Sequence, residues 1–155
     1  MFSWLANLIL NRNIARLREG DYRPLLRSDA KNVRFRFPGD SSFAADLVGK
    51  DALEEWLKRF VDVGLQIYPD EVILQGFPWL ATICVRGTVY LDEDGRRVYD
   101  NRYVLWGHMR WGLVTDYEVY EDTQEAKRFD EHLTVRPAGL SSMSPQRVSP
   151  QRTGG

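Results

Sequence analysis

Apolar residues recur with the period of an α-helix in two segments of the first half of the chain. The clearer segment carries Leu53, Trp56, Leu57, Phe60 and Val61 at i, i+3, i+4, i+7 and i+8. The preceding residues, Asp51-Ala52-Leu53-Glu54, have the pattern of a capping box, in which both acidic side chains bond backbone N–H groups at the helix start. The sequence therefore predicts an amphipathic helix that begins at this motif and ends near Gly64.

The other helical segment is at the N-terminus. Phe2, Leu5 and Ile9 share one face, and Leu10, Ile14 and Leu17 extend it, so we expect a helix from about Phe2 to Glu19 that stops at Gly20. Asp21 then caps a short helical piece, Tyr22 to Leu26. The apolar stretch is far shorter than the roughly 20 residues of a membrane span and has no basic residue before it, so no membrane span is predicted. A helix that lies on a membrane surface stays an alternative.

The remaining pattern is that of β-strands. Asn32 to Phe37 alternates with period two and places Val33, Phe35 and Phe37 inward, and Pro38-Gly39 ends it. A loop from Asp40 to Asp46 follows. Beyond the amphipathic helix we predict strands over 71–75, 79–91, 98–109 and 113–120, with turns at 92–95 and 110–112. Asp122-Thr123-Gln124-Glu125 is a second capping pattern and opens a last helix to about His132. Helices followed by antiparallel strands indicate an α+β fold.

Composition and charge narrow the function classes. The 21 basic and 22 acidic residues give a net charge of -1, which argues against a nucleic-acid surface because such surfaces need a basic excess. A single cysteine, Cys84, allows no intrachain disulfide and fits a reducing, cytoplasmic compartment. The sequence has no Cys/His cluster and no phosphate-binding loop, so we expect no metal and no cofactor.

The composition changes near residue 135. Residues 135–155 hold no acidic residue, are rich in Pro, Ser, Gly and Gln, and repeat Ser-Pro-Gln-Arg at 144–147 and 149–152. Such a stretch buries too little apolar area to offset its ordering entropy. We therefore predict one folded domain over 1–134 and a disordered basic tail over 135–155, with a peptide docked by a partner as the alternative.

Several short motifs, taken in order, resemble those of the SnoaL-like family of the nuclear transport factor 2-like superfamily. They are the Asn101-Arg102-Tyr103 strand start, the turn glycine Gly112, the Tyr120-Glu121-Asp122-Thr123 strand end, Phe37-Pro38-Gly39, and the helix start Gly49-Lys50-Asp51-Ala52. The resemblance covers roughly residues 10 to 132. It implies a cone-like bent antiparallel sheet packed on N-terminal helices around an apolar pocket, usually in a homodimer. Members include ketosteroid isomerases, polyketide cyclases, limonene-type epoxide hydrolases and dehydratases.

The acids that carry catalysis in those relatives have no match here. The aspartate that cyclases and epoxide hydrolases place on the last strand corresponds to Val119, and the base that ketosteroid isomerases place on the first strand corresponds to Phe35 or Phe37. The isomerase tyrosine falls near Asn13. The Arg-x-Asp pair of the epoxide hydrolases corresponds to Arg86-Gly87-Thr88, which keeps only the arginine. Fold alone therefore does not settle the function.

Strand parity supplies candidate ligand-binding residues. If Val119 faces the pocket, so do Leu113, Thr115 and Tyr117, and across the hairpin Asn101, Tyr103, Leu105, Gly107 and Met109, unless a bulge inverts part of the pattern. Tyr103 and Tyr117 are candidate hydrogen-bond donors, Asn101 a partner for a ligand carbonyl, and Arg86 a partner for an oxyanion. Trp56 and Phe60 are candidate pocket walls. For each, the alternative is a structural side chain with protein partners.

Candidate bases are Asp40 and Asp46, in the loop over the predicted pocket mouth, and His108. Parity puts His108 and Asp116 on the outer face, where a surface or dimer-interface pair is the alternative. The leading hypothesis is a cofactor-free acid–base enzyme, such as an isomerase, cyclase, dehydratase or hydrolase, that acts on an apolar polyketide-, steroid- or terpenoid-like molecule. The alternative is a non-catalytic ligand-binding or dimerising subunit. We also expect a homodimer formed through the outer face, with Trp106 and Tyr120 at its centre.

Overall fold

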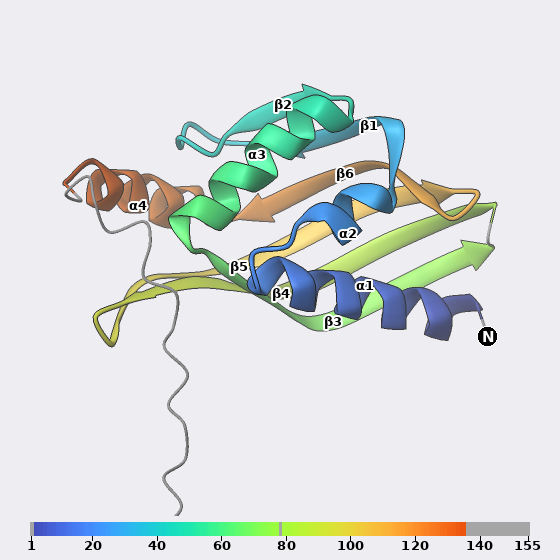
Figure 1. Cartoon of the computed structure of the whole chain (residues 1–155), viewed down its shortest axis with the longest axis horizontal. Coiled ribbons are helices and arrows are strands. Elements are labelled where there is room, and N and C mark those ends of the chain that lie inside the picture. The colour runs from blue at the N-terminus through green and yellow to red at the C-terminus, as the bar shows by residue number, and fades with distance from the viewer. Residues whose placement is uncertain (1, 78, 136–155) are drawn as a thin grey trace, which may run out of the picture.

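The structure, a computed structural model, describes residues 2–77 and 79–135. Its elements in chain order are α1 (Phe2–Arg18), α2 (Arg23–Arg27), β1 (Asp29–Phe37), β2 (Ala45–Val48), α3 (Lys50–Val63), β3 (Gln66–Phe77), β4 (Leu80–Glu93), β5 (Arg96–Arg110), β6 (Leu113–Glu121) and α4 (Thr123–Val135). Helices and antiparallel strands alternate little along the chain, which confirms the predicted α+β class (Figure 1).

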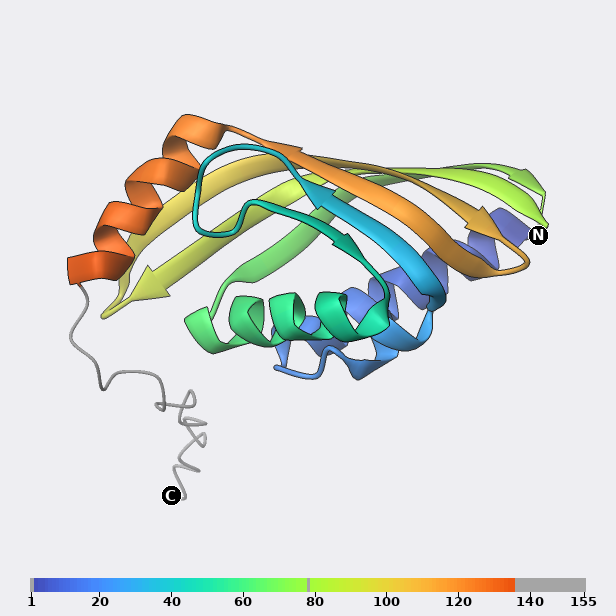
Figure 2. The same cartoon turned by 90° about the horizontal axis from the view of Figure 1, so that it is seen from above.

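The strands form one curved six-stranded sheet in the order β2-β1-β6-β5-β4-β3. All neighbours are antiparallel except β1 and β6, which run parallel. Figure 2 shows the sheet arching over α1, α2 and α3, which cover its concave face, whereas α4 lies at the end where β6 finishes. The concave face therefore forms a cone that three helices close, as the resemblance implied.

The predicted periodicities place the core correctly. Val33, Phe35 and Phe37 are buried from β1, and Leu53, Leu57 and Phe60 are buried from α3. Both tight turns form as predicted, and each is a two-residue turn with positive φ at both positions: Asp94 and Gly95 in one, Trp111 and Gly112 in the other. Since that geometry matches the twist of paired strands, β4 and β5 continue right up to the turn.

Three local predictions were wrong. The capping box does not form, because Gly49 occupies the N-cap without a side-chain bond and the Glu54 carboxylate instead accepts the Tyr22 hydroxyl at 2.9 Å. Asp46 lies in strand β2 rather than in a loop, since 45–48 pairs with β1. Strand β3 extends beyond the predicted 71–75 in both directions because it pairs with β4 along its whole length. Asp70 has no partner in this pairing and forms a bulge between Pro69 and Glu71.

The helix caps predicted at Asp122 and Asp21 have different outcomes. Asp122 caps α4, its Oδ1 accepting the backbone N–H of Gln124 at 2.9 Å. The cap predicted at Asp21 is a fourth correction, because Tyr22 occupies the N-cap of α2 without a side-chain bond and Asp21 Oδ1 accepts only the backbone N–H of Arg23, at 3.3 Å. Val135 is the last residue of α4, and the rest of the predicted tail lies outside the described residues. Among the helices described, none is long and apolar enough to cross a membrane.

Candidate functional site

A central pocket of about 90 Å³ lies between the concave sheet and α1, α2 and α3. Its walls are Leu17, Leu25, Phe35, Phe37, Trp56, Leu57, Phe60, Ile67, Val89, Tyr103, Leu105, Tyr117, Val119 and Glu121. A smaller pocket of about 20 Å³ under α4 shares Phe37, Trp56, Phe60, Val89 and Glu121 with it. Glu121 therefore lies where the two spaces adjoin, and a ligand could extend past it toward α4.

Two cross-strand pairs of glycine and tyrosine form the floor of this pocket. Gly87 is opposite Tyr103, and Gly107 is opposite Tyr117. A Cβ added to Gly87 would lie 2.6 Å from the Tyr103 hydroxyl, and one added to Gly107 would lie 2.7 Å from the Tyr117 Cβ. Each tyrosine therefore occupies the space that a side chain would need at the glycine opposite it.

Packed aromatic rings form the pocket wall opposite the floor. Trp56 packs against Phe35 with ring centroids 4.6 Å apart and against Phe60 at 5.6 Å. Its indole N–H donates to the Phe43 carbonyl at 2.9 Å. Phe35 in turn contacts the Tyr117 ring at 5.0 Å. Because each ring is held by at least one other element, the wall is rigid and apolar.

Glu121 is the only carboxylate among the residues that line the central pocket. Burial raises its pKa to about 7, while the hydrogen bond that it accepts from the Tyr99 hydroxyl at 2.8 Å acts in the opposite direction. Tyr103 is directly opposite Glu121 in the β5–β6 register, so the two side chains enter the pocket as neighbours. Burial raises the pKa of Tyr103, and its hydroxyl has no hydrogen-bond partner within the described part of the chain.

This arrangement joins a proton acceptor to a proton donor in an apolar space. A carboxyl group with a pKa near 7 exchanges a proton readily at neutral pH, whereas a phenol with a raised pKa stays protonated and donates. Burial also raises the pKa of Tyr117 well above its ordinary value, so a second phenol is kept neutral at the same wall. These groups suit removal of a proton beside a carbonyl whose oxygen accepts a hydrogen bond.

Comparisons with known proteins agree on the fold. No family model matches the sequence, and a search of curated proteins finds no relative. Solved structures do match: Bal32a from a soil-derived mobile gene cassette is similar over 82% of this chain and 97% of its own, with a TM-score of 0.68 and 18% identity. TerC, co-crystallised with polyporic acid, is similar over 81% of this chain and 95% of its own, with a TM-score of 0.65 and 23% identity. A nuclear transport factor 2-like protein from Burkholderia pseudomallei matches 76% of this chain and 95% of its own, with a TM-score of 0.58 and 23% identity.

The chain has the nuclear transport factor 2-like fold. Within that fold, four of the predicted ligand-binding residues, Trp56, Phe60, Tyr103 and Tyr117, line the central pocket. Asn101 does not line it. Its amide N–H donates to the Asp122 carbonyl at 2.9 Å and to the Tyr99 hydroxyl at 3.0 Å, and its oxygen accepts the backbone N–H of Arg102, so it ties β5 to the start of α4.

The charged residues predicted for the site lie outside the pockets described above. Asp40 is exposed and paired with Lys127 at 2.6 Å, and Asp46 is exposed and paired with Arg34 at 3.0 Å. In both cases the cation holds the pKa of the carboxyl below its ordinary value. Arg86 pairs with Glu71, its cross-strand neighbour, at 3.3 Å. A stable partner on the surface leaves none of them oriented toward the pocket.

His108 is on the outer face, as parity indicated. Its Nδ1 is 2.8 Å from the Asp116 carboxylate, which also accepts the Thr115 hydroxyl at 3.0 Å. A bulge at Thr115 shifts the β5–β6 register so that Met109 is opposite Val114. Val114 therefore faces the concave side in place of Leu113 and Thr115, which corrects that part of the predicted pattern.

Glu121 was missed by sequence reasoning although a signal for it existed. It has the same parity as Tyr117 and Val119, and it stands two residues beyond the position where relatives carry an aspartate. The alternation that placed Val119 in the pocket also places Glu121 there. The predicted strand end at Tyr120 left it out, because strand ends are the least certain part of a pattern-based prediction.

Asp29 is a second buried carboxyl. It is 2% exposed at the start of β1, its Oδ2 has no hydrogen-bond partner within the described part of the chain, and burial raises its pKa to about 7 despite the opposing charge of Lys50. Asp29 does not line the pockets described, but its charge contributes to the raised pKa of Tyr117. Asp29 therefore affects the protonation of a pocket-lining tyrosine without lining the pocket itself.

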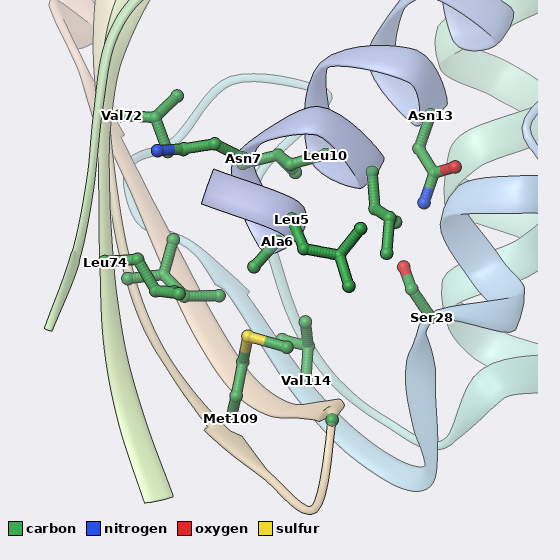
Figure 3. A pocket seen from close by; sticks show the side chains of 13 residues that line it. Leu5, Ala6, Asn7, Leu10, Asn13, Ser28, Val72, Leu74, Met109 and Val114 are labelled. Atoms are coloured by element: carbon green, nitrogen blue, oxygen red, sulfur yellow. The ribbon is translucent and has the colours of Figure 1, made fainter. Parts of the chain in front are cut away.

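A second pocket, of about 150 Å³, lies on the same concave face under the first half of α1. Figure 3 shows Leu5, Ala6 and Leu10 of α1 across from Met109 and Val114 of the β5–β6 hairpin, with Val72 and Leu74 of β3 on the other side. Its polar lining consists of Asn7, Asn13 and Ser28. Since no lining residue has a carboxyl, imidazole or thiol group, this pocket suits binding rather than proton transfer.

Proposed function

We propose that this protein binds an apolar, ring-bearing small molecule in the central pocket and acts on it by cofactor-free general acid–base catalysis. One observation carries the proposal: the partly buried Glu121 carboxyl lies in an apolar space directly opposite the unpaired hydroxyl of Tyr103. Glu121 would remove a proton from carbon beside a carbonyl group. Tyr103 would donate a hydrogen bond to the carbonyl oxygen as negative charge develops there.

This assignment replaces Asp40, Asp46 and His108 as the base. The reaction class stays that of an isomerase, cyclase, dehydratase or hydrolase: the first three can begin with such a proton transfer, and in a hydrolase Glu121 would take the proton from the attacking water instead. The volume of about 90 Å³ sets a limit on the reacting part of the substrate. Because the cavity that accepts benzene has about 150 Å³, the central pocket would hold only the reacting part of a ring, and the rest of the molecule would extend past Glu121 toward α4.

Exchange of carbon-bound hydrogen with deuterium tests the proton-transfer step without the natural substrate. The probes are 1-indanone and 2-cyclohexenone in D₂O, with exchange beside the carbonyl followed by NMR. Glu121→Gln should slow the catalysed exchange by about 10²–10⁴-fold, because it removes the base and keeps the shape. Asp46→Asn makes the same chemical change at an exposed, paired carboxylate and should leave the rate unaltered.

A full exchange rate in Glu121→Gln would remove Glu121 from the mechanism. The second candidate function is a non-catalytic ligand carrier or sensor, which the valine at position 119 favours. It predicts that ligand binds while the wild type gives no exchange above buffer. Native mass spectrometry of the purified protein, and titration with polyporic acid, the compound co-crystallised with TerC, would report binding independently of turnover.

We also propose a homodimer formed through the outer sheet face. Ile73, Trp106 and Tyr120 are exposed there at 49–53%, on strands β3, β5 and β6. An apolar group of this kind is uncommon on the open surface of a monomer. Sedimentation should give a dimer at micromolar concentration, and Trp106→Glu should raise its dissociation constant at least tenfold; a monomeric wild type would contradict the proposal.

A further inference from the structure

One end of the molecule carries most of its exposed apolar side chains. The N-terminal half of α1, the β3–β4 connection and the β5–β6 turn meet there, at the end opposite α4, in both Figure 1 and Figure 2. Trp4 is 69% exposed and Leu8 is 53% exposed on α1, and Trp111 at the β5–β6 turn is 81% exposed. We call this surface the tryptophan end.

The β3–β4 connection adds further apolar residues to the tryptophan end. Phe77 and Trp79 are both more than half exposed, and their rings stack on each other at 5.1 Å instead of packing into the core. Leu80 follows them and is 52% exposed. Two hairpin tips and one helix thus bring exposed aromatic and aliphatic groups to one end of the molecule, which differs from apolar residues scattered singly over a surface.

Acidic residues are sparse around the tryptophan end, and the half-exposed one that follows on β6, Asp116, is paired with His108. The three stretches that contribute to it, 1–18, 72–91 and 101–115, contain none of the chain's 22 acidic residues. They contain Arg12 and Arg110, which make no ion pair within the described part of the chain. Arg12 follows Trp4 and Leu8 at intervals of four residues, so the cation shares their helix face. An apolar surface bordered by unpaired arginines complements a surface that is apolar inside and negatively charged at its rim.

The second pocket opens at this end. Leu5 and Ile9, which line it, are each about half exposed, and Gly112 of the β5–β6 turn also belongs to its lining. The helix and the hairpin tip that bear Trp4 and Trp111 therefore form the rim of an apolar pocket.

We propose that the tryptophan end docks the protein on an anionic lipid bilayer. Tryptophan is favoured at the bilayer interface because its ring is apolar and its N–H remains wet, and arginine is attracted by anionic headgroups. The side chains at the end enter the interfacial region, the body of the protein stays in water, and no segment spans the bilayer. This docking does not depend on the chemistry proposed for Glu121.

Vesicle flotation with the full-length protein tests the proposal. The probes are vesicles of phosphatidylcholine alone and vesicles with about one third phosphatidylserine. The wild type should float with the anionic vesicles, and binding should weaken as salt screens the arginines. Trp79→Ser combined with Trp111→Ser should reduce the bound fraction about tenfold or more. Val135→Ser, which removes an 83% exposed apolar side chain at the opposite end, should not change it.

A second set of variants tests the contribution of the arginines to vesicle binding. Arg12→Gln with Arg110→Gln should lower binding to anionic vesicles and leave binding to neutral vesicles unaltered, whereas Arg102→Gln on the outer face should change neither. Every variant keeps residues 136–155, so the basic tail cannot account for a difference between them. The proposal is overturned if the wild type does not float, or if Val135→Ser loses as much binding as the tryptophan pair. It is equally overturned if the tryptophan pair only converts a dimer to a monomer, since the end would then contact a second copy.

Discussion

The two pockets on the concave face share one sheet but differ in what surrounds them. The central pocket is lined by three helices and five strands, and its polar groups are buried deeply enough to change their pKa. The second pocket is covered by half of one helix and opens to solvent at the tryptophan end. Both pockets are open to solvent on one side, so the difference between them lies in their side chains: Glu121, Tyr103 and Tyr117 line the central pocket, whereas no titratable group lines the second.

The largest expected effect contrasts the wall of the central pocket with the tryptophan end. Phe35 is 1% exposed and contacts both Trp56 and Tyr117, so Phe35→Ala should lower the free energy of unfolding by about 3–5 kcal/mol. Trp111→Ala removes a larger ring that is 81% exposed and should change it by less than about 0.5 kcal/mol. Urea unfolding measures both, and similar losses would show that the end is packed in solution.

The next largest expected effect on stability is at the glycine–tyrosine pairs of the pocket floor. A Cβ at Gly107 would lie 2.6 Å from the Asp116 carbonyl oxygen and 2.7 Å from the Tyr117 Cβ, so Gly107→Ala should cost about 1–3 kcal/mol or more of stability. Gly112→Ala, in the turn of the same hairpin, meets open space and should cost only the strain of its positive φ, about 1 kcal/mol. If Gly107→Ala were neutral, Tyr117 would not lie against the sheet.

The same contrast explains which parts were predictable from sequence. Period and parity placed Phe35, Leu57, Tyr103 and Tyr117 correctly, because one buried face fixes a helix or strand over its whole length. What depends on single contacts was not predictable. Asp46 forms an ion pair with Arg34 on the neighbouring strand. Glu54 accepts a hydrogen bond from the Tyr22 hydroxyl, just before α2, instead of completing a capping box.

The site shows the same division. Parity extended by one residue would have given Glu121, but its pKa depends on burial by α3 and α4 and on the Tyr99 hydroxyl, which no local pattern records. The bulge at Thr115 moved Val114 to the concave face, and one extra residue in a register leaves no signal in composition. The tryptophan end likewise combines three distant segments, each of which alone resembles an ordinary strand or helix.

The pH dependence of stability tests the raised pKa of Glu121 in the central pocket. Because the folded protein binds a proton at Glu121 more tightly than the unfolded chain does, unfolding releases that proton between about pH 4.5 and 7. The free energy of unfolding should therefore fall as pH rises through this window, by about 1–3 kcal/mol for this group. Glu121→Gln should flatten the wild-type curve by that amount, and urea unfolding at several pH values measures it.

Asp29 limits how completely the curve flattens. Its pKa is also raised to about 7, so it adds a dependence of the same sign that Glu121→Gln leaves in place. Glu121→Gln combined with Asp29→Asn should therefore remove more of the slope than either variant alone. An unchanged slope in Glu121→Gln would mean that water reaches the carboxylate and that its pKa is not raised in solution.

The smallest effect concerns the Tyr103 hydroxyl, where stability and binding should change in opposite directions. A buried hydroxyl without a partner destabilises the fold, so Tyr103→Phe should raise the free energy of unfolding by about 1 kcal/mol. If the hydroxyl serves a ligand, the same change should weaken ketone binding by about 0.5–1.5 kcal/mol. Tyr22→Phe is the matched control, because that hydroxyl already donates to Glu54 outside the pocket lining and its loss should only destabilise. Urea unfolding and ligand titration on both variants separate the outcomes. A destabilised Tyr103→Phe with unaltered binding would mean that this hydroxyl has a structural partner, and it would no longer qualify as the donor of the site.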